Sequence, residues 1–388
     1  MPDGAADYPL DELAGKTPLQ AASTPWMDFL AANGCLGKAK TVPAGMNPGS
    51  DVATLSLLGY DPIKYYSGRG PLEAASMGIE LTAGQTAFRC NLVTVENGVL
   101  KDYSAGHVST EEGSSLIEAI QKSMGNKNIT FYPGVSYRHL MVAEGNFAAT
   151  VCMPPHDVVG RALDEIGPQG DGSELLQELM QKSAEVLEKH RINQIRRREE
   201  KNPANMIWLW GQGKAPVMPT LKEKYNLEGA VISAVDLIKG IGRYAGLEAI
   251  EVPGATGYFD TDYLAKAKFA LDALAKKDFV FVHVEAPDEA GHVGNIEEKI
   301  RAIENFDGKI VRPIMEGLKE TDFKILIVPD HATPVRVKTH TSDPVPFLIY
   351  RSSKQIKGKA EGFHERAVED SSLCFEQGFE LMDYFIKP

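Results

Sequence analysis

Short apolar runs alternate with amphipathic stretches in the part of the chain that follows residue 226. The runs FVFVHV, FKILIVPD and PFLIYR have the length of β-strands, and the stretches between them carry apolar residues at helical spacing. This alternation is typical of a mostly parallel sheet that is covered by helices. Ligands of such sheets bind at the carboxyl ends of the strands, so the residues that follow each run are the first candidates for a functional site.

A different pattern fills the middle of the chain. Two extended runs flank Asn97-Gly98, which is the strongest short signal of a β-hairpin. We expect a second hairpin in SYRHLMVAEGNFAATVCM, with Glu144-Gly145-Asn146 at its tip. Apolar residues at helical spacing then predict one long amphipathic helix over residues 175–195. The middle is therefore expected to be an α+β unit with antiparallel strands.

The length of 388 residues exceeds what a single hydrophobic core normally supports, so two domains are expected. Turns and short helices dominate the N-terminal segment, where GKTPLQAASTPWMDFLAANG has the spacing of a helix that ends at Gly34. We predict an α/β domain that is interrupted by the α+β unit. The α/β domain comprises residues 1–86 and 227–388, and the inserted domain comprises residues 87–226.

Composition and charge exclude several classes of partner. Hydrophobic residues make up 43% and charged residues 24% of the chain, as in ordinary soluble globular proteins. The net charge of -12 argues against a nucleic acid or an anionic membrane as partner, and no apolar run approaches the ~18 residues of a membrane span. The four cysteines lie far apart without CxxC spacing, which indicates reduced thiols in a cytoplasmic protein.

Acidic and histidine side chains lie next to the predicted strands. FVFVHV is followed by Asp288 and His292. The last residue of FKILIVPD is Asp330, and His331 comes next. His340 precedes PFLIYR. Taken alone, Asp288 and His292 have the i,i+4 spacing of a surface ion pair, and the other residues are common in turns and cores. Their shared position at strand ends favours a metal site, because carboxylates and imidazoles are ligands of Zn²⁺ and Mn²⁺.

Two residues nearer the N-terminus are candidates for the same site. Asp3 lies in the glycine-containing MPDG loop, and Ser50 precedes the helical run DVATLSLL. The simplest interpretation of Ser50 is an N-cap. A helix N-terminus also binds anions, and a serine that contacts a divalent metal there can attack phosphorus. A parallel sheet normally has an apolar strand before a loop such as MPDG, so we expect either a shortened N-terminus or an Asp3 that is held by a frayed end.

Five stretches together resemble one known family. They are PDGAADYPLDELAGKTPLQAA, NPGSDVATLSLLGYDPIKYYSGRGPLEAASMGIEL, VEAPDEAGH, PDHATP and THTSDPVPF. In this order they are similar to the archaeal-type cofactor-independent phosphoglycerate mutases of the alkaline phosphatase superfamily. The resemblance covers most of the chain and is weaker in the middle segment. It implies an alkaline phosphatase-like α/β fold with an inserted substrate-holding domain, and an isomerase of glycolysis and gluconeogenesis.

The resemblance also implies a mechanism and its residues. The substrate would be a small phosphorylated hydroxy acid, 2- or 3-phosphoglycerate, and Ser50 would carry the phosphoryl group as phosphoserine. Two divalent metal ions, Mn²⁺ or Zn²⁺, would be bound, and no organic cofactor would be needed. The implied ligands of one metal are Asp288, His292 and His340, and those of the other are Asp3, Ser50, Asp330 and His331.

The inserted domain is implied to act as a lid that excludes water and holds the glycerate carboxylate. Cations for this contact are expected in the insert and at its hinges. Each candidate could instead be a surface cation or a capping side chain. The candidates are Arg89, Arg138, Lys239, His107 and His156.

Three kinds of function stay open. The leading one is the mutase. The stretches PPHD, NPANMIWLWGQG and DYSAGH also resemble a bacterial branch proposed to contain homoserine kinases, but no GxxxxGK[ST] nucleotide loop is present. A metal-dependent phosphatase would result if water reached the phosphoserine. A non-catalytic binding protein is disfavoured, because every implied ligand position holds a residue that can bind a metal.

Overall fold

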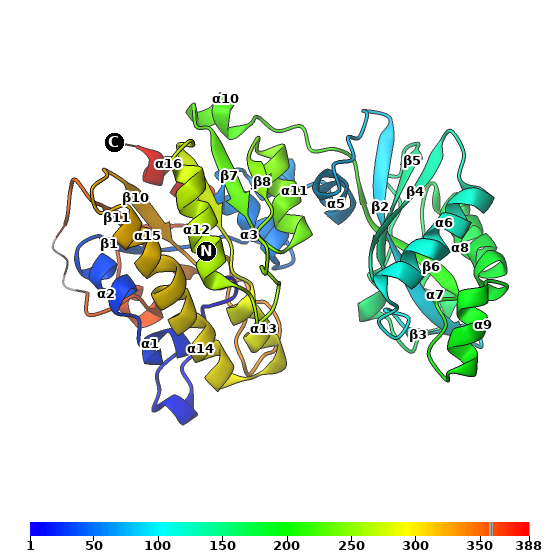
Figure 1. The fold of residues 1–388 in the computed structure, drawn as a ribbon, viewed down its shortest axis with the longest axis horizontal. Helices are drawn as coiled ribbons and strands as arrows, with labels where there is room; N and C mark the ends of the chain where they lie inside the picture. The colour runs from blue at the N-terminus through cyan, green and yellow to red at the C-terminus, as the bar shows by residue number, and fades with distance from the viewer. Residues whose placement is uncertain (357, 359, 388) are drawn as a thin grey trace. The chain divides into compact units, whose positions relative to one another are not determined.

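The computed structural model describes residues 1–356, 358 and 360–387. The chain divides into two compact units (Figure 1). We call Met1–Tyr66 with Val217–Pro388 the core unit, and Ser67–Pro216 the inserted unit. The first boundary precedes the predicted one because helix α5 (Arg69–Ser76) packs on strands of the inserted unit. Within the described residues, no helix has the length and apolar character that crossing a membrane would require.

Two sheets run through the core unit. One has three parallel strands in the order β8-β7-β9, and the other has four strands in the order β10-β11-β1-β12. Strand β11 is antiparallel to both of its neighbours, and β12 is parallel to β1. The strands are β1 (Cys35–Ala39), β7 (Gly229–Ile232), β8 (Glu248–Ile250), β9 (Phe279–Val282), β10 (Lys324–Ile327), β11 (Val345–Arg351) and β12 (Cys374–Phe375). The predicted α/β class is confirmed.

Amphipathic helices pack on these strands because their apolar residues recur at helical spacing. The largest hydrophobic cluster of the core unit contains residues of α12, α14 and α15, and another contains residues of α3 and α16. The helices are α1 (Pro18–Ala21), α2 (Pro25–Ala32), α3 (Ser50–Leu57), α4 (Pro62–Tyr65), α10 (Leu221–Tyr225), α11 (Asp236–Tyr244), α12 (Tyr263–Leu274), α13 (Ala286–Val293), α14 (Ile296–Phe306), α15 (Arg312–Gly317) and α16 (Glu380–Ile386).

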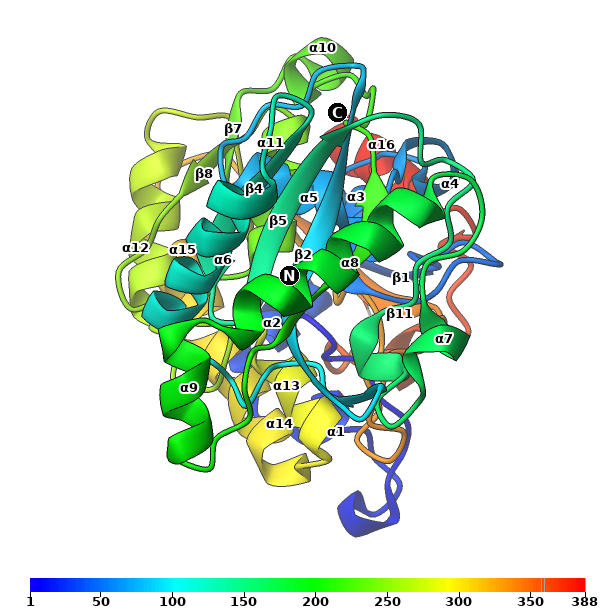
Figure 2. The same cartoon turned by 90° about the vertical axis from the view of Figure 1, so that its right-hand side faces the viewer.

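The inserted unit is an antiparallel sheet with helices on it, as predicted. Its strands have the order β3-β2-β5-β4, and β6 pairs with β2. Helices α6 and α8 cover the same face of this sheet (Figures 1 and 2). The elements are β2 (Gln85–Glu96), β3 (Val99–Asp102), β4 (Ile129–Val135), β5 (Arg138–Glu144), β6 (Met206–Gly213), α6 (Thr110–Met124), α7 (Leu163–Ile166), α8 (Ser173–Glu188) and α9 (Arg191–Arg198).

The turn predictions in this unit have mixed outcomes. The hairpin at Asn97-Gly98 is confirmed, and both residues adopt the left-handed conformation that a tight hairpin turn requires. The hairpin at Glu144-Gly145-Asn146 is wrong, because β5 pairs with β4 and their turn lies at Ser136-Tyr137. The prediction of one long helix over 175–195 is also wrong. Helix α8 ends at Glu188, and α9 begins at Arg191, where the ring of His190 accepts a hydrogen bond from the N–H of Ile192.

A buried ion pair joins two loops of the core unit. Lys299, on α14, is fully buried, and its Nζ donates hydrogen bonds to Asp7 Oδ2 at 2.8 Å and to the carbonyl of Thr333 at 2.8 Å. The ammonium also contacts the carbonyl of Ala6 at 3.2 Å. A buried charge is tolerated only when it is paired in this way. Lys299 therefore fixes the loop after Asp3 against the loop after His331.

We predict that Lys299→Ala lowers the free energy of unfolding by about 3–5 kcal/mol, because the Asp7 carboxylate is left buried without its cation. Urea denaturation at neutral pH measures this loss. The matched control is Arg301→Ala on the same helix, whose exposed guanidinium lies 2.6 Å from Glu298. This control is expected to change the free energy of unfolding by less than about 1 kcal/mol. Equally small losses in the two variants would contradict a structural role for the buried pair.

Candidate metal centre

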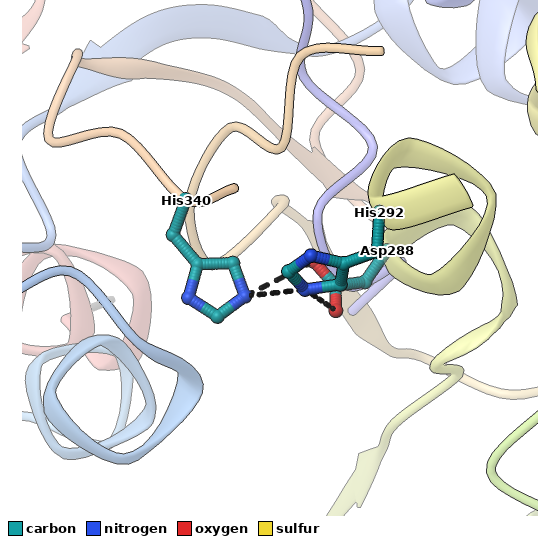
Figure 3. Close-up of side chains that lie close together, drawn as sticks. All are labelled: Asp288, His292 and His340. Carbon is teal, nitrogen blue, oxygen red and sulfur yellow. Dashed lines mark hydrogen bonds and ion pairs between the residues drawn. The ribbon is translucent and has the colours of Figure 1, made fainter. Parts of the chain in front are cut away.

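Three predicted ligands converge at one point of the core unit (Figure 3). Asp288 and His292 lie one turn apart on α13, and His340 comes from the loop before β11. His292 Nε2 is 3.1 Å from Asp288 Oδ2 and 2.9 Å from His340 Nε2, and His340 Nε2 is 3.5 Å from Asp288 Oδ1. Asp288 is buried and the two imidazoles are half-buried. The structure thus brings together the three residues that were predicted to share a metal.

The electrostatics of this group suit a cation. Burial disfavours the ionised form of Asp288, but hydrogen bonds from His292 and His340 outweigh it and hold the pKa of this carboxyl well below its usual range. The same hydrogen bond with Asp288 raises the pKa of His292 to about 9. Two imidazole nitrogens that face each other at 2.9 Å require a proton or a cation between them. A divalent metal would replace that proton.

A second group lies beside the first and is deeper. Asp3, Asp330 and His331 are fully buried, and their ligand atoms converge. His331 Nε2 lies 3.3 Å from Asp330 Oδ2 and 3.6 Å from Asp3 Oδ1. Within the described residues, Asp3 Oδ1 and Asp330 Oδ2 are buried without a hydrogen-bond partner. Burial, and next the nearby Asp330, raise the pKa of Asp3 well above its usual range. Buried carboxylate oxygens without partners fit a bound cation.

Ser50 adjoins this second group. Its Oγ is 3.2 Å from Asp3 Oδ2 and 3.2 Å from His331 Nε2. Ser50 is the first residue of α3, and Gly49 occupies the N-cap position, so the interpretation of Ser50 as an N-cap is wrong. The hydroxyl therefore lies at a helix N-terminus, where the first N–H groups lack partners within the helix and favour an anion.

The backbone around Asp3 explains how a residue so close to the N-terminus is held. The N–H of Asp3 donates to the carbonyl of Val284 at 2.9 Å, and the N–H of Gly4 donates to Asp330 Oδ1 at 3.0 Å. Gly4 has φ +59°, and a Cβ at this position would lie 2.5 Å from Asp288 Oδ1. The expectation that a frayed end holds Asp3 is wrong, because this residue is fully buried and fastened on both sides.

The sequence reasoning missed two residues of this centre, His283 and Glu285. His283 Nε2 is 2.7 Å from Asp3 Oδ2 and 3.1 Å from Glu285 Oε2, and its Nδ1 is 2.9 Å from Ser233 Oγ. Burial lowers the pKa of His283 to about 3 and raises that of Glu285 to about 8. The signal was available, because alternate residues after a strand point to the same side. His283 positions Asp3 for its partners.

Four of the five predicted substrate-binding residues gather in the inserted unit around aromatic rings. The guanidinium of Arg89 is 4.4 Å from the ring centroid of Trp210, and its Nε is 2.8 Å from Glu73 Oε1. The ring of His156 is 5.4 Å from that of Trp210. Burial lowers the pKa of both Arg89 and His156. We call this group, with the residues below, the cation-aromatic cluster.

Tyr137 carries the other side of the cation-aromatic cluster. The guanidinium of Arg138 lies 5.8 Å from its ring centroid, and the ring of His107 lies 6.0 Å from it. Tyr103 contacts both Tyr137 and His156. Lys239 lies elsewhere, on α11 of the core unit, where its Nζ is 2.8 and 2.9 Å from the two oxygens of Glu251. Sequence reasoning found the cations but not the rings that hold them.

We predict that metal affinity at the Asp288 group depends on pH, because the ion must displace the proton from His292. Affinity for Mn²⁺ is expected to rise about tenfold per pH unit above neutrality and to level off above about pH 9, the pKa of His292. The stability of the metal-free protein depends on pH in the opposite direction to metal affinity. In metal-free protein the raised pKa stabilises the fold below pH 6.5, and that contribution is lost as pH rises through about 9.

Calorimetric titration of the Asp330→Asn variant with Mn²⁺ checks this prediction. The substitution weakens metal binding at the second group, so the heat reports on binding at the Asp288 group. Buffers with different ionisation enthalpies count the protons that are released. About one proton per ion is expected at neutral pH. An affinity that does not change between pH 7 and pH 9, with no proton released, would show that the prediction is wrong.

Comparison with known proteins identifies the family of this chain. Residues 31–193 match the family profile described as 2,3-bisphosphoglycerate-independent phosphoglycerate mutase. The protein of that name from Methanosarcina barkeri is 54% identical over 99% of this chain and 98% of its own length. A solved structure from Pyrococcus horikoshii, 34% identical, has a TM-score of 0.85 and covers 100% of this chain and 95% of that chain.

A cofactor-independent phosphoglycerate mutase from Thermoplasma acidophilum has a TM-score of 0.67 at 28% identity, and the match covers 99% of this chain and 96% of that chain. The match to the Methanosarcina barkeri protein covers nearly the whole length of both chains, so no long segment of either one is unmatched. The chain belongs to the family of 2,3-bisphosphoglycerate-independent phosphoglycerate mutases.

Proposed function

We propose that this chain interconverts 2- and 3-phosphoglycerate without a bisphosphoglycerate cofactor, and that Ser50 carries the phosphoryl group between the two positions. The observation that carries the mechanism is the place of the Ser50 hydroxyl. It lies 3.2 Å from both a buried carboxylate and a buried imidazole, at the start of a helix. The names of the family's members support the substrate.

The transfer takes place in two steps, first from the substrate to Ser50 and then from Ser50 back to glycerate. Ser50 Oγ gives up its proton and attacks phosphorus, the bond from phosphorus to one oxygen of the substrate breaks, and that oxygen takes up the proton and becomes a hydroxyl. Glycerate reorients, its other hydroxyl gives up its proton and attacks phosphorus, and the bond from phosphorus to Ser50 Oγ breaks, so that Ser50 takes up the proton again. The N-terminus of α3 would favour the negative charge of the phosphoryl oxygens in both steps. Water must be excluded in between, since hydrolysis of the phosphoserine would make the chain a phosphatase.

The residues present fit two divalent cations, for which we propose Mn²⁺ or Zn²⁺. Asp288, His292 and His340 would hold one ion, and Asp3, Asp330, His331 and Ser50 would hold the other. When bound, such ions lower the pKa of a serine hydroxyl and neutralise charge on the transferring phosphoryl group. His283 holds Asp3 through a 2.7 Å contact, so the ligand is oriented before any ion arrives.

We propose that the cation-aromatic cluster of the inserted unit provides a cation for the substrate carboxylate. Arg89 already has a carboxylate partner in Glu73, and its guanidinium is almost wholly buried. Arg138 is exposed at the start of β5, with its guanidinium beside the ring of Tyr137. We infer that Arg138 binds the glycerate carboxylate, because a guanidinium pairs with a carboxylate through two parallel hydrogen bonds.

We predict that Ser50→Ala lowers mutase turnover by at least about a thousandfold, because the phosphoryl acceptor is lost. The assay converts 3-phosphoglycerate to 2-phosphoglycerate in the presence of Mn²⁺ and without bisphosphoglycerate. Ser173→Ala is a matched control, since Ser173 is likewise the first residue of a helix that follows a glycine N-cap, α8. This control is expected to keep full activity, and circular dichroism verifies that both variants are folded.

Other reaction products would identify a different activity of the same centre. Release of inorganic phosphate in place of 2-phosphoglycerate would identify a phosphatase. Phosphorylation of homoserine that depends on ATP would identify a kinase on the same centre. A wild-type protein that binds metal and shows none of these activities would refute the proposed function.

We predict that Arg138→Ala raises KM for 3-phosphoglycerate by about 10- to 100-fold and changes kcat much less. A charge-assisted hydrogen bond to a carboxylate contributes about 1.5–3 kcal/mol, and it holds the substrate equally in the ground and transition states. Steady-state kinetics measure both constants. Arg161→Ala is the control, because this exposed guanidinium pairs with Glu165 on the same unit. An unchanged KM in Arg138→Ala would place the carboxylate contact on another residue.

A further inference from the structure

Thr333 lies between the two groups of predicted metal ligands and contacts a residue of each. Its Oγ1 donates a hydrogen bond to Asp288 Oδ1 and lies 3.2 Å from Nδ1 of His331. Asp288 belongs to the first group, and His331 belongs to the second. Thr333 is fully buried. One hydroxyl therefore joins the two groups, although Thr333 is not itself a predicted ligand.

Two glycines leave room for the side chain of Thr333. A Cβ on Gly4 would lie 2.6 Å from Thr333 Oγ1, and a Cβ on Gly291 would lie 2.8 Å from Thr333 Cγ2. Gly4 follows Asp3 in the chain, and Gly291 precedes His292. The side chain is therefore packed against backbone on both sides, next to ligands of both groups. A test of the hydroxyl must keep the shape of this side chain, because a close-packed site does not accept a larger one.

Separate contacts hold the backbone of Thr333. Its N–H donates to the carbonyl of Ala6 at 3.3 Å, and its carbonyl accepts a hydrogen bond from Nζ of Lys299 at 2.8 Å. Neither contact uses the side-chain hydroxyl. Removal of the hydroxyl should thus leave the loop in place and change only the contacts with Asp288 and His331.

The hydroxyl of Thr333 has one proton, and its two neighbours determine where that proton points. An ionised carboxylate only accepts hydrogen bonds, so the proton is directed to Asp288 Oδ1. The oxygen of Thr333 is then left to accept from Nδ1 of His331, which must carry the imidazole proton. Nε2 of His331 keeps its lone pair. This is the nitrogen that faces Asp3 and Asp330 in the second group.

The other two imidazoles of the centre show the same pattern. Nδ1 of His292 is 3.2 Å from the carbonyl of Lys338, and Nδ1 of His340 is 3.3 Å from the carbonyl of Pro48. A carbonyl only accepts, so each Nδ1 carries a proton, and the Nε2 atoms are those that face each other in the first group. Histidine ligands of metals usually donate their second ring N–H in this way. His331 differs because a side chain, which can be substituted, takes the place of the carbonyl.

We propose that Thr333 is a positioning residue of the metal centre: its hydroxyl holds His331 in the tautomer that leaves Nε2 unprotonated, and the same hydroxyl orients Asp288 in the other group. One side chain thus supports metal binding at both groups. Loss of a partner that orients a metal ligand typically lowers metal affinity by about 10- to 100-fold. This inference rests on the metal centre of the proposed function.

Two substitutions separate the hydroxyl of Thr333 from the shape of its side chain. Thr333→Val removes the hydroxyl and keeps the shape, whereas Thr333→Ser keeps the hydroxyl and removes a methyl group. Calorimetric titration with Mn²⁺ is expected to show about 10- to 100-fold weaker binding at both groups in Thr333→Val, and a loss of less than about threefold in Thr333→Ser. The Asp330→Asn background isolates the Asp288 group, so the loss there is measured separately.

The matched control is Thr24→Val, which makes the same substitution away from the ligands. Thr24 is also buried in the core unit, and its hydroxyl likewise donates to a carboxylate, that of Asp28, at 3.3 Å. This variant is expected to bind Mn²⁺ with the affinity of the wild type.

Nuclear magnetic resonance reports the tautomer of His331 in metal-free protein. Long-range ¹H–¹⁵N spectra distinguish a proton on Nδ1 from one on Nε2, and the loss of one signal in His331→Gln assigns this residue. The wild type and Thr333→Ser are expected to show Nδ1–H. Thr333→Val is expected to shift His331 toward Nε2–H, because that proton can be donated to the carboxylates of the second group. A purely structural role of Thr333 would not move this signal.

Three results would overturn the inference. The first is a wild type whose His331 carries its proton on Nε2, and this result needs no variant that folds. The second is a Thr333→Val variant that binds Mn²⁺ as tightly as the wild type. The third is a Thr333→Ser variant that binds as weakly as Thr333→Val, which would assign the effect to packing. A wild type that binds no Mn²⁺ would refute the metal centre together with this inference, so the two failures can be distinguished.

Discussion

The core unit depends on placing four acidic side chains, Asp3, Glu285, Asp288 and Asp330, in one largely buried site. Carboxylates that share a medium of low dielectric repel each other and lose hydration, so an isolated cluster of this kind would oppose folding. This unfavourable electrostatic free energy is reflected in the pKa values of Asp3 and Glu285, which burial raises. Imidazoles and protonation of these carboxyls relieve part of the repulsion, and the proposed divalent cations would relieve the rest. Binding of these ions would then be coupled to folding.

The surrounding loops hold the carboxylates of this site in place. Asp7, four residues after Asp3, has its own cation in Lys299. The hydroxyl of Thr333 donates to Asp288 Oδ1, which fixes that carboxylate against the loop after β10. Bridges from Ala332 to Ala5 and to Thr341 join the loops that carry Asp3, His331 and His340. Several loops thus hold the ligands in place without neutralising them.

Regular patterns in the sequence predicted the elements, and local spacing predicted part of the site. Strands β9, β10 and β11 were found because they are short apolar runs between amphipathic helices, and Asp288 and His292 because they are one helical turn apart. The β4-β5 turn was missed because Ser136-Tyr137 contains no glycine or asparagine, whereas Glu144-Gly145-Asn146 resembles a turn that the chain does not make. The alternation of His283 and Glu285 after β9 was a signal that they share a side, but the contact of His283 with Asp3 joins residues 280 positions apart and has no local pattern.

The distribution of positive charge explains how one substrate could react at two of its oxygens. A chain with a net charge of -12 and a cluster of carboxylates repels a phosphorylated acid, so local positive charge must offset this repulsion at the site. Fixed cations such as Arg138 are instead carried by the inserted unit, where they suit a carboxylate. In the proposed mechanism, Ser50 would carry the phosphoryl group while the carboxylate is held separately, so that glycerate could exchange its two hydroxyls by rotation without leaving. On this proposal the carboxylate contact contributes to affinity, whereas the transfer itself depends on the groups around Ser50.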